Sequence, residues 1–425
     1  MNYYKDNMTI LKGNIVYTKT KEEFIIAKNS YLVAVGNCIK GVLEKLPEEF
    51  KEVPVRDYKD NLIVPGLVDL HTHASQFNIR GIGYDKELLP WLESYTFKEE
   101  AKFKDKTYGR KVYKEFVNEL YRQGTTRAVI FATIHEDTTQ ILMDLLNKKG
   151  ICAYVGKVNM DRNSPEYLIE QTDESIKKTE EWIQKCKDKY DAVKVIITPR
   201  FVPSCTTSLM NKLGELAGEY RIAVQSHLSE NVSEIQWVKE LYPESKSYAH
   251  VYDDFGLLGQ TKTIMAHGVH LNEDEIERIK KNNVFIAHCP SSNVNLSSGI
   301  AEISQLLKKG VKVGLGSDIA AGEKLSIFNS MACAIKISKL RAACLKDKSK
   351  PLTISEAFYL GTKGGGEFFG KVGSFEEGYE FDALVIDDYK LWKFEKGSIE
   401  ERIERLIYLG DERNIIARYA FGKEI

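Results

Sequence analysis

The sequence predicts an α/β fold, a (β/α)8 barrel of the TIM type with a small β-sandwich domain built from both termini. Three observations predict it. Strand-like apolar runs alternate with helix-like segments through the middle of the chain, and both ends hold only short strand-like segments. Polar residues able to bind a metal also stand at the ends of several runs. The 425 residues suit a barrel with insertions plus a small second domain.

Eight short apolar runs are the candidate barrel strands. Their nearly continuous apolar composition is typical of strands buried on both faces of a parallel sheet. The runs cover residues 62–71, 126–132, 151–160, 192–198, 222–227, 263–267, 284–288 and 311–317.

Helix-like segments lie between most of these runs. Their apolar residues recur at spacings of three and four, with charged residues on the opposite face. Gly124, Gly150 and Gly310 follow helix ends, where a left-handed cap favours glycine. The main segments cover 106–122, 139–149, 174–188, 208–218 and 272–281, and segments 326–345 and 353–361 are expected to close the barrel.

The two ends of the chain differ from its middle. Residues 8–54 contain short strands separated by turns, and the tail contains further short apolar segments. We therefore expect residues 1–65 and 373–425 to form one small β-domain, and residues 66–372 to form the barrel.

Composition excludes several classes of protein. Lys and Arg number 60 and Asp and Glu 61, so the charge balance gives no footprint for nucleic acid or a membrane surface. Residues 1–6 lack an apolar segment, and no apolar stretch approaches 18 residues, which argues against secretion and a membrane span. The seven cysteines are widely spaced and fit reduced thiols. We expect a cytoplasmic protein.

Five residues at strand ends form a candidate metal site: His71, His73, His227, His267 and Asp318. They follow the first, fifth, sixth and eighth runs. A closed barrel brings these ends together on one face, whereas an open doubly wound sheet, the alternative fold, does not readily do so. Imidazole and carboxylate ligands without a thiolate are typical of a catalytic metal with an open position for water.

Glu230 follows His227 by three residues and is the candidate proton shuttle between the metal-bound water and the substrate. Asp318 can both bind the metal and accept a proton from that water. His267 is either a further ligand or a hydrogen-bond partner of the hydroxide, and spacing does not separate the two. Lys194 lies within a strand without a supporting ligand, which favours one metal over two.

Several motifs together resemble the amidohydrolase superfamily, in particular its one-metal deaminase branch. They are Pro-Gly-Leu-Val-Asp-Leu-His-Thr-His at 65–73, His-Leu-Ser-Glu at 227–230, His-Cys-Pro-Ser-Ser-Asn at 288–293 and Leu-Gly-Ser-Asp at 315–318. Stretches 73–76, 89–100, 156–161 and 198–201 are further similar to the guanine-deaminating members of this branch.

The resemblance implies roles for individual residues. Metal ligands would be His71, His73, His227 and Asp318, with Glu230, His267 and Asp318 as the catalytic groups. Gln76, Trp91, Arg200 and Phe201 would bind the purine: the amide and guanidinium donate to ring acceptors, and the aromatic rings pack on the base.

The implied activity is hydrolytic deamination of guanine to xanthine and ammonia. The enzyme would use one Zn²⁺ per subunit, with Fe²⁺ as the alternative metal. It would form a homodimer, and the molecule it binds would be a small-molecule purine base. Two other readings stay open at this point. One is a deaminase of another base or of an adenosine derivative, and the other is a barrel that kept its fold without catalysis.

Overall fold

The structure, a computed structural model, describes residues 7–345, 350–392 and 394–425. Residues 1–6, which bore on the prediction of no secretion signal, lie outside these ranges. Among the described helices, none combines the length and the apolar character that crossing a membrane requires.

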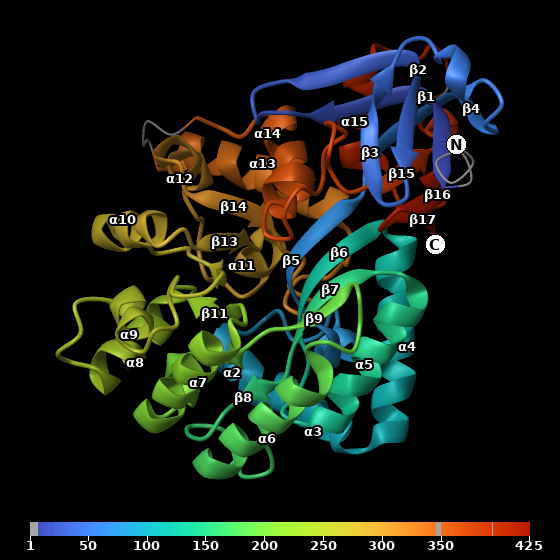
Figure 1. Cartoon of the computed structure of the whole chain (residues 1–425). Helices are drawn as coiled ribbons and strands as arrows, with labels where there is room; N and C mark the ends of the chain where they lie inside the picture. Colours follow the sequence, from blue (N-terminus) through green and yellow to red (C-terminus); the bar gives the residue numbers. More distant parts are fainter. Residues whose placement is uncertain (1–6, 346–349, 393) are drawn as a thin grey trace.

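Eight parallel strands surround the middle of the molecule (Figure 1). They pair in two groups, β5-β6-β7-β9 and β11-β12-β13-β14. The groups join through a parallel bridge between Ile197 and Val224, and on the other side through the Asp318 amide, which donates to the His71 carbonyl at 2.8 Å. The strands are β5 (Leu67–His73), β6 (Thr125–Phe131), β7 (Cys152–Gly156), β9 (Val193–Val195), β11 (Val224–Leu228), β12 (Thr263–His267), β13 (Phe285–His288) and β14 (Lys312–Leu315).

This ring agrees with the predicted barrel and not with an open sheet. Two further short strands, β8 (Val158–Asn159) and β10 (Thr198–Pro199), pair beyond the carboxyl ends of β7 and β9. They extend the chain toward the face where the predicted site residues lie.

Helices cover the outside of the ring, as the sequence periodicity predicts (Figure 1). The expected segment 106–122 coincides with α4, and Gly150 and Gly310 adopt the predicted left-handed caps with φ of 83° and 79°. The helices are α2 (Leu88–Trp91), α3 (Phe97–Ala101), α4 (Lys106–Arg122), α5 (Glu136–Lys149), α6 (Thr172–Cys186), α7 (Thr207–Tyr220), α8 (Val232–Leu241), α9 (Tyr248–Asp254), α10 (Glu273–Lys281), α11 (Pro290–Asn295), α12 (Ile303–Lys309), α13 (Ile327–Cys344), α14 (Ile354–Tyr359) and α15 (Ile399–Leu409).

Strands from both termini share one small sheet beside the barrel (Figure 1). Its order is β17-β16-β15-β4-β1-β2-β3, so the tail strands pair with the N-terminal ones. All seven described strands belong to this one sheet, and the second sheet of a sandwich stays a prediction. The strands are β1 (Met8–Thr18), β2 (Phe24–Val35), β3 (Cys38–Leu43), β4 (Val55–Pro65), β15 (Ala383–Ile386), β16 (Ile415–Ala420) and β17 (Lys423–Glu424).

The prediction of one continuous strand over 62–71 is wrong, because the run is divided at Gly66. Residues before Gly66 belong to β4 of the small sheet, and those after it to β5 of the barrel. A side chain is excluded at this change of direction, since a Cβ on Gly66 would lie 2.2 Å from the Thr126 hydroxyl oxygen. The first metal-ligand strand is therefore tied directly to the small sheet.

A buried ion pair fastens the small sheet to the barrel. Arg127 of β6 donates from Nε and Nη2 to the two oxygens of Asp382, at 2.6 and 2.9 Å, and from Nη2 to Glu380 at 2.9 Å. Arg127 and Asp382 are both buried. A bidentate pair of this kind supplies the charge compensation that burial requires.

Candidate active site

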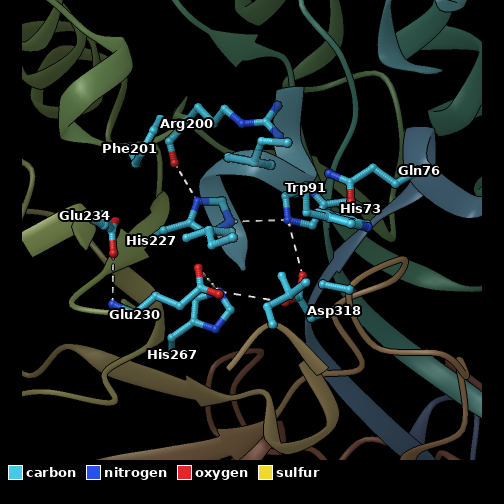
Figure 2. Close-up of a pocket in the computed structure, with 14 residues that line it drawn as sticks. His73, Gln76, Trp91, Arg200, Phe201, His227, Glu230, Glu234, His267 and Asp318 are labelled. Carbon is cyan, nitrogen blue, oxygen red and sulfur yellow. Dashed lines mark hydrogen bonds and ion pairs between the residues drawn. The ribbon is translucent and has the colours of Figure 1, made fainter. Parts of the chain in front are cut away.

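The ends of four barrel strands bring the predicted metal ligands together (Figure 2). His71 and His73 end β5, His227 lies in β11, His267 ends β12, and Asp318 follows β14. Because the side chains of β5 alternate, its two histidines point to the same side.

The imidazole nitrogens converge on one point. His73 Nε2 lies 3.2 Å from both His71 Nε2 and His227 Nε2. Asp318 Oδ1 lies 3.2 Å from His71 Nε2 and 3.4 Å from His73 Nε2. All four side chains are buried or nearly so.

Hydrogen bonds on the outer side orient the imidazoles. His227 Nδ1 lies 2.5 Å from the Arg200 carbonyl oxygen, which only accepts, so Nδ1 carries the proton and Nε2 turns its lone pair to the centre. His267 Nδ1 lies 3.0 Å from Asn293 Oδ1 in the same way. This is how proteins hold a histidine for metal binding.

Burial also disfavours the charged form of two of these imidazoles. It lowers the pKa of His73 and of His227 well below the usual value, and neighbouring imidazoles lower both further. Burial alone would raise the pKa of Asp318, but the facing histidines outweigh it and hold that pKa well below its usual range. The site therefore offers imidazoles whose charged form burial disfavours, at His73 and His227, and an ionised carboxylate at Asp318.

These donors fit one divalent ion. Ligand atoms about 2.0–2.1 Å from a tetrahedral zinc lie roughly 3.4 Å from one another, close to the separations seen here. His71, His73 and His227 form one group whose ligand atoms lie within 4.8 Å, and His71, His267, Cys289 and Asp318 form another. Burial raises the pKa of Cys289 well above the usual value, so its thiol is protonated and a poor ligand.

Glu230 stands beside this cluster without belonging to it. Its Oε2 lies 3.3 Å from His267 Nε2, and Ser298 donates to Oε1 at 3.2 Å. Burial, then the carboxylates of Glu234 and Asp318, raises the pKa of Glu230 well above its usual value. This side chain is suited to holding a proton near neutral pH and releasing it to a bound molecule.

The predicted base-binding residues line the same pocket (Figure 2). Gln76 lies in the helical turn Ala74–Ile79 directly after β5, Trp91 ends α2, and Arg200 and Phe201 follow β10. The Trp91 indole donates to the Ile82 carbonyl at 2.9 Å, and the Phe201 ring packs edge-on against Trp237 at 6.2 Å. Polar and aromatic side chains thus face the candidate metal ligands across one cavity.

Some residues around the site escaped the sequence analysis. Glu100 accepts hydrogen bonds from both Gln76 and Arg200, and Asn293 and Ser298 hold His267 and Glu230. Glu100 and Asn293 lie in the stretches 89–100 and 288–293 quoted above. Their place in these family-like stretches is the one feature of the sequence that could have pointed to them. Lys194 is exposed and its ammonium lies 5.9 Å from the Tyr154 ring, outside both ligand groups.

A barrel whose strand ends gather histidines and an aspartate around one point is the arrangement of a metal-dependent hydrolase. The family model described as the amidohydrolase family matches residues 62–424. The chain belongs to this family, which confirms the resemblance drawn from its motifs.

Individual relatives and a solved structure show which members of the family this chain is similar to. The chain is 42% identical to a guanine deaminase of Dictyostelium discoideum, over 87% of this chain and 84% of the relative. It is 41% identical to the guanine deaminase of Homo sapiens, over 90% and 87% respectively. A crystal structure of guanine deaminase from C. acetobutylicum with guanine bound in its active site superposes with a TM-score of 0.97 at 53% identity, covering 99% of this chain and 100% of that one.

Proposed function

We propose that this chain catalyses the hydrolytic deamination of guanine to xanthine and ammonia. The observation that carries the proposal is that one pocket holds both sets of groups. In it, the candidate metal ligands face the Gln76 amide, the Arg200 guanidinium and two aromatic rings. Relatives of matching length that bear this activity support it.

In the proposed reaction, water adds to C2 of the base and the bond from C2 to the exocyclic nitrogen breaks. A bound ion held by His71, His73, His227 and Asp318 would supply Lewis-acid chemistry and acidify the water. Asp318 takes the first proton as the oxygen attacks. Glu230 donates its proton to the adjacent ring nitrogen, takes up the remaining hydroxyl proton of the adduct and passes it to the departing amine, which leaves as ammonia while the C2 carbonyl forms. The proton held by Asp318 then returns to Glu230 and resets the site.

His267 has a different part in this proposal. Its Nε2 faces both Glu230 Oε2 at 3.3 Å and Asp318 Oδ2 at 3.8 Å. It therefore lies between the two proton-carrying carboxylates, where its inward-facing Nε2 accepts a hydrogen bond from the attacking water and orients the oxygen. We assign it to this role rather than to the ligand set.

The base is held by the opposite wall in the proposed complex. Gln76 and Arg200 donate to its oxygen and ring nitrogens, and Phe201 and Trp91 pack against the ring. We further propose one Zn²⁺ per subunit, with Fe²⁺ as the alternative, a homodimer, and a cytoplasmic location. The division into a small domain of residues 1–65 and 373–425 and a barrel of 66–372 stays part of the proposal.

Metal analysis and a substrate panel test the function together. The purified protein is expected to contain one equivalent of divalent metal, to release ammonia from guanine, and to lose this activity on chelation and regain it with zinc. Adenosine derivatives and cytosine serve as comparison substrates. Ammonia from one of these but not from guanine would replace guanine deamination by the related-deaminase reading.

A further inference from the structure

A buried carboxylate lies behind the base-binding wall of the pocket. Glu100, in the short helix α3, is 2% exposed. Its Oε1 accepts from Gln76 Nε2 at 3.0 Å, and its Oε2 accepts from Arg200 Nη1 at 2.6 Å. It is absent from the residues that line the cavity, so it contacts the base-binding side chains from outside the cavity.

Glu100 fixes which way the Gln76 amide faces. An ionised carboxylate only accepts hydrogen bonds, so the NH₂ group must turn toward it. The carbonyl oxygen of the same amide then points the other way, where it accepts from the Ala320 backbone at 3.3 Å. Two independent contacts therefore select one amide orientation, in which Gln76 has a second N–H available.

Arg200 is held in a comparable way. Only Nη1 of its guanidinium is bonded to Glu100, and its ring-stacking partner is Phe97, 5.2 Å away. Among the described residues, no hydrogen bond engages its Nε or Nη2. The same carboxylate thus leaves two neighbouring side chains with unused donors beside one cavity (Figure 2).

We propose that Glu100 is a positioning residue that makes this wall select purines carrying a carbonyl at C6 over purines carrying an amine there. A C6 carbonyl accepts from the free donors, whereas a C6 amine presents its own donors to them. Sites built to pair with one polar group discriminate steeply against a mismatched one. The inference rests on the proposed function, because it assumes that the base enters this pocket.

The test compares guanine with 2,6-diaminopurine, which keeps the reacting 2-amino group and replaces only the C6 oxygen by an amine. Glu100→Gln substitutes an amide that can donate to the Gln76 oxygen, so the Gln76 amide is free to turn over. The ratio of kcat/KM for guanine to that for 2,6-diaminopurine is expected to fall at least about tenfold.

Glu99→Gln is the matched control. Glu99 is an adjacent carboxylate, also 2% exposed, but it accepts from Lys102 and Tyr108 instead of the base-binding residues. In Glu99→Gln, the ratio of kcat/KM for guanine to that for 2,6-diaminopurine is expected to stay within about twofold of the wild-type ratio. Glu100→Asp, which keeps the charge but withdraws it by one methylene, should fall between the two and serves if Glu100→Gln does not fold.

The outcomes separate the two claims. An equal loss for both substrates, or an unchanged ratio in the Glu100 variants with metal content intact, overturns the positioning role and leaves guanine deamination standing. A wild-type protein without activity on guanine refutes the proposed function, and the inference fails with it.

Discussion

Two buried arginine–carboxylate pairs in this molecule differ in how completely the arginine is used. Arg127 gives Nε and Nη2 to both oxygens of Asp382 and reaches Glu380 as well. Arg200 gives one nitrogen to Glu100 and keeps other donors free beside the pocket. A buried guanidinium that is bonded to two carboxylates joins parts of the fold, whereas one with a single carboxylate contact beside a pocket is prepared for a ligand.

The imidazoles of the candidate metal site also differ from the buried ion pairs in how many of their polar atoms are hydrogen-bonded. In the candidate metal site, His73 Nε2 lies 3.2 Å from the Nε2 atoms of His71 and His227. When each of these nitrogens turns a lone pair inward, they cannot stabilise one another by hydrogen bonding. The geometry is stabilised from outside by the contacts of His227 and His267, and by Asp69, which accepts from the backbone amides of His71 and Ser317. Around the candidate metal site, the ring nitrogens on the outer side are thus paired, while those that face the centre are left for an ion.

The largest effect is expected from Glu230→Gln. This variant keeps the shape of the side chain but cannot carry the proton, so kcat for ammonia release should fall by about 10²–10⁴. Metal content should stay at the wild-type level, because Glu230 is outside both ligand groups. Turnover and metal content measured on the same preparation check this, and wild-type turnover would contradict the assigned role.

Asp382→Ala should break the more extensively paired side of the comparison, the contact of Arg127 with Asp382. Removing Asp382 leaves the buried Arg127 with only the less buried Glu380 as a carboxylate partner, at a cost of up to about 3–5 kcal/mol in the free energy of unfolding. Denaturant unfolding measures the loss. The control is Glu424→Ala, whose exposed pair with Arg56 lies on the same small sheet and should matter far less. Similar losses in both variants would rule out the anchoring role of Arg127.

Arg200→Lys tests the partly paired side. Lysine keeps the positive charge near Glu100 but loses the planar fork of donors. Loss of a hydrogen bond from a charged donor to the base is expected to lower kcat/KM for guanine about ten- to hundredfold. The midpoint of thermal unfolding is the accompanying control. A wild-type kcat/KM would remove Arg200 from the binding wall.

The smallest effect concerns a single imidazole. His135 is partly buried, and its buried Nε2 has no hydrogen-bond partner among the described residues. Burial, followed by Lys157, lowers its pKa to about 4. Because this folded-state value lies below the unfolded value of about 6.5, neutral His135 contributes stability above pH 6.5 that is lost as the pH falls toward 4.

His135→Gln should remove this part of the acid sensitivity. The decline of the unfolding midpoint between pH 7.5 and 5 is expected to be shallower in the variant than in the wild type. Parallel declines would show that His135 is charged in the folded protein or does not change its exposure on unfolding.

Much of the barrel could be predicted because its strands are buried on both faces. Runs such as 263–267 are largely apolar up to the closing histidine, and the observed strand β12 has those bounds. The division at Gly66 could not be predicted, since the residues on both sides are equally apolar. What separates them is pairing with β15 in the tail and β6 in the barrel, and a local pattern carries no information on partners so distant.

The candidate ligands could be predicted for a similar reason, because each ends a readable strand. Glu100 could not, although it belongs to a family-like stretch. A pair of glutamates in a helix is typical of a solvated face, and its burial comes from contacts with residues 24 and 100 positions away. Side chains that orient other side chains leave little trace in periodicity.

The division at Gly66 also has a consequence for the order in which the protein is made. Strand β4 lies between β1 and β15 in the small sheet, and β15 is followed only by β16 and β17 among the strands. During synthesis, the strand that carries the first two histidines therefore emerges long before its anchor can be completed. Until β15 emerges, β4 has β1 beside it but lacks its second neighbour, so the segment that leads into the histidine pair stays unpaired on one side.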